Sequence, residues 1–366
     1  MIALAVIVIV VGSVAYLHST RMSPSKTASP AARALLVTSD RVHFNFISPS
    51  VGWALDFSES LPQPVAGRFW VLRTLDGGRH WQTQLTGQNG YSAFIAEPIQ
   101  VFDRDHGFIF VGGSPDQLYR TSDGGAHWDS ISLPPNRQIE RLAFSDPSNG
   151  WLLAAANSTL SQRNLFATHD GGNSWQQLGD PPVDAAGLSF RRPTEAWMGS
   201  FGLGPPHVYV SSDASHSWQR HDLPAPGPSW DPTADYQVSS DLLPAAGVVV
   251  AAFLASPQSG APPGPFYFTS VDGGITWTHV RLPTNSVAYQ DAVHWWAISG
   301  GALLKSSDAG QTWIQVADNL PDGLFVPYIL DSKHAWALLF VVGGFGLALT
   351  DDGGLHWTRA NVPHPT

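Results

Sequence analysis

The sequence predicts an all-β protein, and three observations lead to this fold class. Glycine and proline are both frequent, with 35 and 29 copies among 366 residues, and tryptophan occurs 15 times. Many short strands joined by Gly/Pro turns have such a composition, whereas long helices do not. The body of the chain shows no sustained helical periodicity, and one short motif recurs along most of its length.

The recurring motif is [Ser/Thr]-x-Asp-x-Gly-x-x-Trp, which we call the box turn. It occurs seven times without gaps, and its aspartates follow one another at a mean interval of 46 residues, the length of one four-stranded propeller blade. Only Ser215, in the glycine position of the fourth copy, departs from the pattern. The aspartates and tryptophans of the seven copies are Asp76 and Trp81, Asp123 and Trp128, Asp170 and Trp175, Asp213 and Trp218, Asp272 and Trp277, Asp308 and Trp313, and Asp352 and Trp357.

The segments around the box turns complete the repeat. A strand upstream of most copies opens with Gly-Trp or a close relative, a third apolar strand runs into the box turn, and a fourth leaves from its tryptophan. Four strands in each of seven repeats predict a seven-bladed β-propeller with four antiparallel strands per blade. The openings of the second strand are Gly52-Trp53, Gly107-Phe108, Gly150-Trp151, Ala196-Trp197, Trp295-Trp296 and Ala335-Trp336.

The residue types of the box turn have structural reasons. Glycine supplies the positive φ of a tight hairpin, and the aspartate carboxylate accepts backbone N–H bonds across its own turn. The tryptophan ring is expected to fill space between neighbouring sheets, where its burial removes roughly 150–250 Å² from water. We therefore expect these residues to be structural and not catalytic. A calcium site is not expected either, because no copy supplies the alternating oxygen ligands and closing glutamate of a calcium loop.

Composition excludes several other function classes. The net charge of -10 argues against nucleic acid as a partner, because phosphate neutralisation requires a basic face. The absence of cysteine excludes disulfides, cysteine-ligated metals and thiol nucleophiles. No glycine-rich phosphate loop follows a strand and opens a helix, so nucleotide binding has no support. We predict no cofactor and no metal site.

The N-terminus predicts export. Residues 2–17 are apolar apart from Gly12 and Ser13, which is short of the roughly 20 residues of a spanning helix but matches the hydrophobic region of a signal peptide. Arg21 and Lys26 follow this run and no positive charge precedes it, which favours the opposite orientation under the positive-inside rule. We predict a signal peptide or membrane anchor in residues 1–20, a flexible linker in 21–40, a propeller in 41–360, and a periplasmic or extracellular location.

The seven copies resemble the Asp-box (BNR) repeat of sialidases, xyloglucan-type glycoside hydrolases, sortilin-type receptors and the photosystem II stability and assembly factor family. The resemblance covers about residues 41 to 360 and is closest to the last of these families, whose members are exported seven-bladed propellers that act as assembly scaffolds. It implies a non-catalytic scaffold that binds protein subunits of an envelope or membrane complex. Because the same repeat occurs in unrelated functions, it is specific for the fold and weak for the activity.

Strand alternation predicts where a partner would bind. If the strands of each repeat run outward from the axis, the box turns and the turns between first and second strands share one face, which we call the box face. The longest insertions, residues 57–67, 222–236 and 254–265, then fall on the opposite, non-box face, where propeller ligands usually meet variable loops. Candidate binding residues outside the repeat pattern are Glu59, Tyr91, Arg137, Arg163, Phe201, Trp230, Asp231, Asp235 and Tyr236.

Two other function classes remain open at this point. A sialidase-like glycoside hydrolase would need an arginine triad, a tyrosine nucleophile and a supporting glutamate, and the chain has only four glutamates and no Arg-Ile-Pro segment ahead of the first box turn. Asp231 and Asp235 are a possible carboxylate pair for hydrolysis. A glycan-binding module is the third class, suggested by loop aromatics such as Trp230.

Overall fold

The computed structural model describes residues 41–60, 65–88, 98–113, 115–156, 163–203, 205–225, 235–238, 249–255, 266–284, 287–341 and 344–360. The predicted export segment and linker, residues 1–40, lie outside these ranges. Within them the chain forms strands, and no helix is long and apolar enough to cross a membrane.

The described ranges contain 28 strands. In chain order they are β1 (Arg41–Phe46), β2 (Gly52–Ser60), β3 (Val65–Thr74), β4 (Gln82–Gln88), β5 (Ile99–Val101), β6 (Gly107–Val111), β7 (Gln117–Thr121), β8 (Asp129–Ile131), β9 (Arg137–Phe144), β10 (Gly150–Ala156), β11 (Arg163–Thr168), β12 (Gln176–Gln177), β13 (Ala185–Arg192), β14 (Glu195–Leu203), β15 (His207–Ser211), β16 (Gln219–Asp222), β17 (Asp235–Val238), β18 (Val249–Ala255), β19 (Phe266–Ser270), β20 (Thr278–Val280), β21 (Val287–Tyr289), β22 (Trp295–Ser299), β23 (Ala302–Ser306), β24 (Ile314–Ala317), β25 (Leu324–Ile329), β26 (Ala335–Val341), β27 (Gly344–Thr350) and β28 (Thr358–Ala360).

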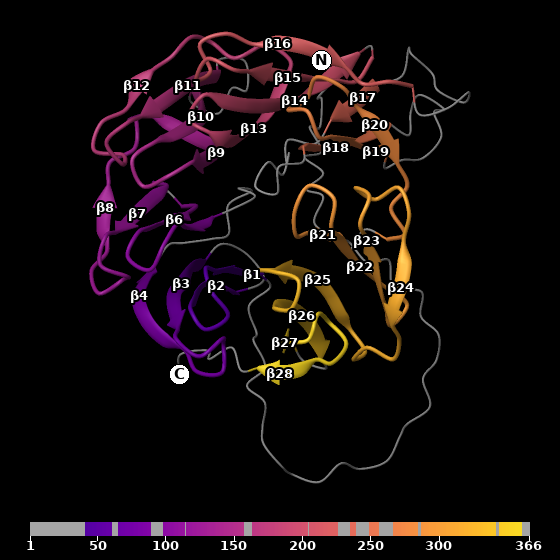
Figure 1. The fold of residues 1–366 in the computed structure, drawn as a ribbon. Coiled ribbons are helices and arrows are strands. Elements are labelled where there is room, and N and C mark those ends of the chain that lie inside the picture. Colours follow the sequence, from indigo (N-terminus) through magenta and orange to yellow (C-terminus); the bar gives the residue numbers. More distant parts are fainter. Residues whose placement is uncertain are drawn as a thin grey trace.

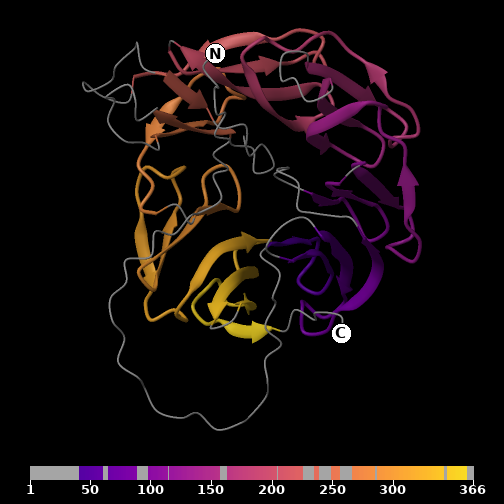
Figure 2. The same cartoon turned by 180° about the vertical axis from the view of Figure 1, so that it is seen from behind.

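The strands form an all-β propeller of antiparallel sheets arranged in a ring (Figures 1 and 2). Each sequence repeat supplies four consecutive strands, from β1–β4 in repeat 1 to β25–β28 in repeat 7. The first strand of a repeat lies toward the axis and the fourth lies at the outer rim (Figure 1). This agrees with the predicted fold class and with four strands per repeat.

The number of separate sheets differs from the prediction. We expected seven separate blades, but the strands form six sheets, because repeats 4 and 5 share one sheet of eight strands. The cause lies in β14, which pairs with β13 as far as Ser200 and then continues. Its last three residues, from Phe201 to Leu203, pair antiparallel with β17 of the next repeat. This backbone pairing merges two repeats that the sequence pattern treats as separate.

Strand register fixes which residues lie at which end of a sheet. In repeat 3, Gly150 pairs with Phe144 on one side and with Thr168, the first residue of a box turn, on the other. At the opposite end of the same sheet, Ala156 pairs with Arg137 and Ala155 pairs with Arg163. The two arginines therefore lie at the end of repeat 3 that is remote from the box turn.

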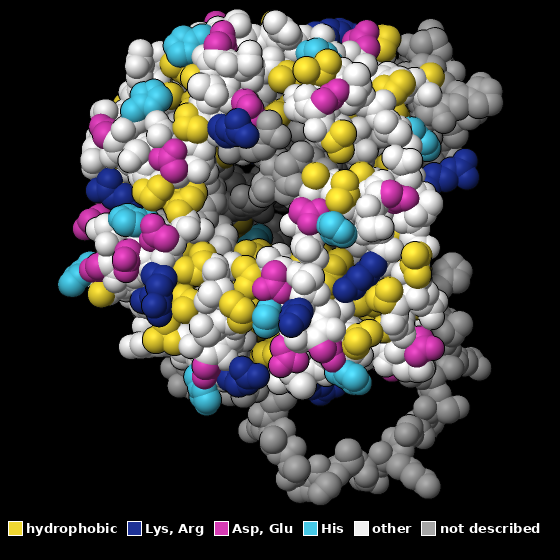
Figure 3. Space-filling view, in the orientation of Figure 1, with side chains coloured by type: hydrophobic (Ala, Val, Ile, Leu, Met, Phe, Trp, Pro, Cys, Tyr) yellow, Lys and Arg dark blue, Asp and Glu magenta, His cyan; other side chains and the backbone are white. Residues whose placement is uncertain are grey.

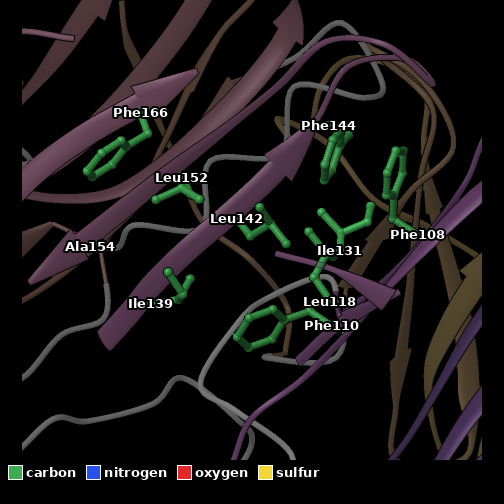
Figure 4. Packing of buried hydrophobic residues seen from close by; sticks show 10 residues of the cluster. All are labelled: Phe108, Phe110, Leu118, Ile131, Ile139, Leu142, Phe144, Leu152, Ala154 and Phe166. Carbon is green, nitrogen blue, oxygen red and sulfur yellow. The ribbon is translucent and has the colours of Figure 1, made fainter. Parts of the chain in front are cut away.

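The core consists of clusters between neighbouring repeats, one of which is shown in Figure 4. In this cluster Phe144, from the first strand of repeat 3, stacks on Phe108 of repeat 2 with ring centroids 3.6 Å apart. Phe190 stacks in the same way on Trp151, from the second strand of the preceding repeat, at 3.9 Å. The aromatic residue that opens a second strand thus forms the interface with the next repeat.

This stacking explains why glycine so often precedes that aromatic residue. A Cβ on Gly150 would lie 2.4 Å from ring atoms of Phe144, and one on Gly52 would lie 2.3 Å from Phe46. The first-strand ring lies directly over the glycine Cα, so that no side chain fits there. The burial of tryptophan also differs from our expectation, since Trp53 and Trp151 of the second strands are fully buried, whereas all seven box-turn tryptophans are only half-buried.

Candidate binding face

The box turns are held by the same contacts in all seven repeats. The first residue's hydroxyl donates to the aspartate Oδ1 at 2.7–3.0 Å and accepts the backbone N–H four residues later at 2.7–2.9 Å. Oδ1 also accepts the N–H of the residue before the tryptophan at 2.8–3.0 Å. The aspartates are therefore engaged within their own turns, which leaves them poorly suited to act on a ligand.

The second carboxylate oxygen is also occupied in every copy. The residue before the tryptophan reaches Oδ2 with its side chain: through Nδ1 in His80, His127 and His356, and through a hydroxyl in Ser174, Ser217, Thr276 and Thr312. Histidine and hydroxyl residues thus have the same role at this position. The side-chain and then the backbone hydrogen bond from Ser174 lower the pKa of Asp170 from 3.8 to about 2. Ser217 lowers the pKa of Asp213 to about 2 in the same way.

A second recurring turn, which the sequence analysis missed, joins the first and second strands. In Asp103, Asp291 and Asp331, Oδ1 accepts two backbone N–H bonds and the carboxylate contacts Nδ1 of the histidine three residues later. Asp146 makes the equivalent contacts with Asn149. The pattern Asp-x-x-[His/Asn] ahead of the second strand was visible in the sequence. These turns share the box face, because their carbonyls accept box-turn N–H groups, as Asp105 does from Gly124.

Three basic side chains directly precede box turns; Arg73 and Arg120 link neighbouring repeats, and Lys305 packs within its own repeat. Arg73 lies over the ring of Trp53 at 4.6 Å and donates to the carbonyl of Gly124 in the next box turn at 2.6 Å. Arg120 donates to the carbonyl of Gly171 at 3.0 Å, and Lys305 lies 3.8 Å over the ring of Trp296. These cations stabilise the ring on the box face. They do not form a basic patch for a partner.

The structure describes some of the predicted binding residues in full, some by their backbone alone, and some not at all. Tyr91, Trp230 and Asp231 lie outside the described residues. The backbones of Glu59, Phe201, Asp235 and Tyr236 are described: Glu59 lies in β2, and the other three lie in the β14–β17 pairing, where Tyr236 pairs with Gly202 and Phe201 with Gln237. The side chains of Arg137 and Arg163 are described in full.

Arg163 forms part of the junction between repeats 3 and 4. Its Nε lies 2.9 Å from Oε2 of Glu140, and both side chains are only about one-sixth exposed, at 15% and 16%. Its guanidinium also donates to the carbonyl of Ala185, the first residue of repeat 4, at 2.6 Å. This mostly buried guanidinium binds Glu140 of repeat 3 and the carbonyl of Ala185 in repeat 4, so it links two sheets. Few of its N–H donors are therefore available to a partner.

A compact polar cluster continues this junction into repeat 4. The Tyr209 hydroxyl donates to Oδ1 of Asp184 at 2.6 Å, and Nε2 of the buried His207 lies 3.1 Å from Oδ2 of the same carboxylate. Burial, followed by the hydrogen bond to Asp184, raises the pKa of Tyr209 to about 12. Next to Asp184 in the chain, Val183 is 97% exposed, the highest value among the described large hydrophobic residues.

Arg137 is placed differently. Its guanidinium carbon lies 6.0 Å over the ring of Phe166, and it forms no ion pair with any residue in the described ranges. The neighbouring acid, Asp116 of repeat 2, already accepts backbone N–H bonds from Gly113 and Ile139, and burial raises the pKa of its carboxyl group. Arg137 is therefore a half-buried cation at the end of repeat 3 remote from the box turn, and no carboxylate among the described residues pairs with it.

Charged side chains elsewhere on the surface are dispersed. Figure 3 shows basic, acidic and histidine side chains scattered over one face of the ring, which is hollowed near its centre. Across the described part of the chain, no group of three or more histidine, aspartate or glutamate side chains is arranged to hold a metal ion.

Comparisons with known proteins place the chain among propellers of this kind. The family model of sortilin, neurotensin receptor 3, matches residues 70–194, about a third of the chain. The photosystem II assembly lipoprotein Ycf48 from a Synechococcus strain is 26% identical over 341 residues, which cover 87% of this chain and 88% of that protein. A xyloglucanase from Paenibacillus sp. is 24% identical over 247 residues, which cover 57% of this chain and 23% of the enzyme.

A solved structure supports the fold. The structure of Ycf48 bound to a D1 peptide superposes with a TM-score of 0.51 at 18% identity, covering 93% of this chain and 99% of that chain. At this level of identity the likeness shows a shared propeller fold. By sequence, the photosystem II assembly lipoprotein thus matches 87% of the chain, and the Paenibacillus xyloglucanase matches 57% of it.

Proposed function

We propose that this chain is an exported, non-catalytic β-propeller that binds a protein subunit of a membrane or envelope complex and assists its assembly or stability. The observation that carries the proposal is the similarity to photosystem II assembly lipoproteins over 87% of the chain. The contacts of the box turns support it, because they commit the recurring acidic side chains to the fold. The hydrophobic segment 2–17 is the proposed signal peptide or membrane anchor.

The proposed binding surface is the non-box face around Arg137 and the loop that contains Trp230. A guanidinium beside an aromatic ring, as in Arg137 over Phe166, attracts carboxylates, which it binds in a bidentate geometry. Val183 offers an exposed apolar contact across the same face of repeats 3 and 4. We therefore expect the partner segment to carry an acidic group together with apolar side chains. Phe201, Asp235 and Tyr236, whose backbones lie where repeats 4 and 5 join, are included among the proposed binding residues.

The proposal is tested with the full chain by cross-linking pull-down from native envelope membranes, followed by identification of the captured subunit. Replacing Arg137→Ala and Trp230→Ala together is expected to abolish capture without lowering the melting temperature. Arg79→Ala is the matched control, because Arg79 is an exposed arginine of the box face. Capture that is equal for the double variant and the control would place the partner surface elsewhere.

A glycoside hydrolase of sialidase-like type, or a glycan-binding module, is the alternative function, favoured by the xyloglucanase match. Turnover of aryl glycosides or xyloglucan by the purified chain would establish hydrolysis and overturn the non-catalytic proposal. Binding on a glycan array without turnover would instead establish a glycan-binding module. We expect neither signal.

A further inference from the structure

Large aliphatic side chains gather on the box face in one part of the ring. The second and sixth positions of the box turn are exposed in every copy, and in repeats 1, 5 and 7 they include Leu75, Val271, Ile275 and Leu355, which are 50–67% exposed. In repeats 2, 3 and 4 the same positions carry only alanine or polar residues, namely Ser122, Ala126, His169, Asn173, Ser212 and His216. In repeat 6, Val293 of the turn before β22 is 36% exposed, and its carbonyl accepts the N–H of Ala309 in the box turn.

The repeats that carry these side chains, 5, 6, 7 and 1, follow one another around the ring (Figure 1). Repeats 5 and 6 share the core cluster of Val280 and Trp295, and repeats 6 and 7 share another. Repeat 7 adjoins repeat 1, where the Tyr328 hydroxyl donates to the carbonyl of Phe46 at 3.0 Å. Single exposed apolar residues are normal, but a set confined to adjoining turns of one face marks an interaction surface. We call this set the aliphatic arc: Leu75, Val271, Ile275, Val293 and Leu355.

The turns that carry the aliphatic arc are acidic. Within residues 47–51, 74–81, 270–277, 290–294, 306–313, 330–334 and 350–357, the lysine and arginine residues are Arg79 and Lys333, against seven aspartates: Asp76, Asp272, Asp291, Asp308, Asp331, Asp351 and Asp352. The box-turn aspartates hold their own turns but keep their negative charge, and Asp351 is exposed at the second box-turn position of repeat 7. Negative charge beside aliphatic side chains attracts cations and repels anions. The chemistry that complements the arc is therefore aliphatic and basic.

We propose that the aliphatic arc binds an amphipathic segment of another protein that carries aliphatic side chains together with lysine or arginine. The aliphatic side chains of the segment pack on the turn tips, and its cations lie beside carboxylates such as that of Asp351. An anionic lipid surface does not fit, because the turns hold seven acidic and two basic residues. The arc also differs in charge from Arg137, which lies at the end of repeat 3 remote from its box turn. Binding at the arc does not depend on what Arg137 binds.

Fluorescence anisotropy with the full chain and a labelled amphipathic peptide of leucine and lysine tests the proposal. The test variant carries residues that other repeats have at the same box-turn positions: Leu75→Ser, Val271→Ser, Ile275→Asn and Leu355→Asn. We expect saturable binding by the wild type and a dissociation constant at least about tenfold higher for this variant, with an unchanged melting temperature. Val183→Asn is the control and should leave the affinity unchanged, because Val183 is exposed near the opposite end of repeat 4. Equal affinities of the wild type and the test variant, or an equal loss in the control, would overturn the proposal.

A second measurement locates the bound peptide and uses the absence of cysteine from the chain. Gln311→Cys places one thiol at the exposed sixth box-turn position of repeat 6, within the arc, and Ala126→Cys places one at the same position of repeat 2. An environment-sensitive dye on the thiol is expected to shift its emission to shorter wavelength on peptide binding at position 311 and not at position 126. Equal shifts at the two positions would contradict binding on the arc.

Two further probes separate the chemistry of the ligand. A peptide in which glutamate replaces lysine is expected not to bind, because the turns of the arc are acidic. Equal binding of the two peptides would show that the aspartates do not select the ligand and would overturn the proposal. Phosphatidylcholine vesicles are the last probe, and we expect the wild type and the test variant to bind them equally. Vesicle binding that the test variant loses would identify the arc as a lipid-binding surface instead.

Discussion

Phe46 in the first strand of the ring stacks on Trp336 near its end, with ring centroids 3.6 Å apart and planes within 7°. The same arrangement joins Phe144 to Phe108 inside the ring, at the same distance and angle. The indole N–H of Trp336 also donates to the carbonyl of Gly77 in the first box turn at 2.9 Å. Within the described residues, repeats 1 and 7 each keep their own four strands, and side chains of an ordinary repeat interface join the two ends of the ring.

The closing interface can be tested with Trp336. Trp336→Ala removes a buried indole and the stacking contact that this indole makes with Phe46. We therefore expect it to lower the free energy of unfolding by about 3–5 kcal/mol. Trp336→Phe keeps an aromatic ring on Phe46 but loses the bond to Gly77, and we expect a loss of about 1 kcal/mol from that bond. Urea denaturation monitored by circular dichroism measures both. An alanine variant with an unchanged urea midpoint would show that the contact between repeats 1 and 7 does not stabilise the protein.

Gly150 tests the steric reason for glycine ahead of the second-strand aromatic residue. A methyl group at this position would lie 2.4 Å from the ring of Phe144, which cannot retreat because it already stacks on Phe108. Gly150→Ala is therefore expected to destabilise the protein by about 1–3 kcal/mol, the range for overpacked cores. Gly179→Ala is the matched control, because a Cβ added there would have no atom within 4 Å and its φ is not in the left-handed region. Thermal melting that ranks the two variants equally would refute this explanation.

The sequence predicted much of this architecture, because the repeat has strong local signals. Turn residues such as Asp76 and Gly78 and the interval between copies identify the four-stranded unit without tertiary information. The junction of repeats 4 and 5 has no such signal: Phe201, at the end of β14, and Gln237, in β17, pair across 36 positions of chain, beyond the part of β14 that the repeat pattern marks. Pattern alone therefore gave seven blades where the strands form six sheets.

The candidate site was less predictable for a related reason. Arg137 and Arg163 look alike in sequence, as single arginines at the beginning of strands. Only the fold brings Glu140 and the carbonyl of Ala185 to Arg163, across 23 and 22 positions of chain, and so makes it a link between repeats. Among the described residues, Arg137 receives no such carboxylate partner.

The two arginines are accordingly expected to behave in opposite ways. Arg163→Met leaves the largely buried carboxylate of Glu140 without its charged partner, and we expect a loss of about 1.5–3 kcal/mol of stability. Arg137→Ala removes only a cation–π contact, which contributes roughly 0.5–1 kcal/mol at an exposed site, but we expect it to weaken partner capture. Denaturation midpoints and the pull-down measured on both variants check this separation. Strong destabilisation by Arg137→Ala would mean that it too is structural.

Acid stability should depend on the box turns. The pKa of Asp170 is lowered from 3.8 to about 2, so the unfolded chain takes up a proton at a higher pH than the folded chain does. The stability that this carboxylate contributes is complete above about pH 4 and is lost as pH falls toward 2. Six box-turn aspartates have a pKa of about 2, and that of the seventh, Asp308, is also lowered, so their effects act together.

Ser174→Ala isolates one of these turns. It removes the hydroxyl donor to Oδ2 of Asp170 and is expected to move the pKa of that carboxyl group back toward its ordinary value. A carboxyl-carbon NMR titration of the folded protein between pH 2 and 5 follows the change. Ser122→Ala, at a box-turn position with an exposed side chain, should leave the pKa of Asp123 unchanged. An Asp170 titration that is identical in wild type and Ser174→Ala would show that the hydroxyl does not hold this carboxylate.

The fourth box turn should be improved by restoring the glycine that the other copies have. Ser215 adopts a φ of 69°, in the left-handed region that costs an L-residue roughly 1–2 kcal/mol, and its hydroxyl is buried without a hydrogen-bond partner in the described structure. Ser215→Gly removes both of these costs. Against this, glycine raises the conformational entropy of the unfolded chain, which costs about 0.4–1 kcal/mol of stability, so we expect the free energy of unfolding to rise by about 1 kcal/mol. The reverse change in repeat 3, Gly172→Ser, should destabilise by more than this gain, because its Cβ would lie 2.9 Å from Ile131. Differential scanning calorimetry measures the two shifts, and a Ser215→Gly variant that melts below the wild type would show that the serine is needed in its turn.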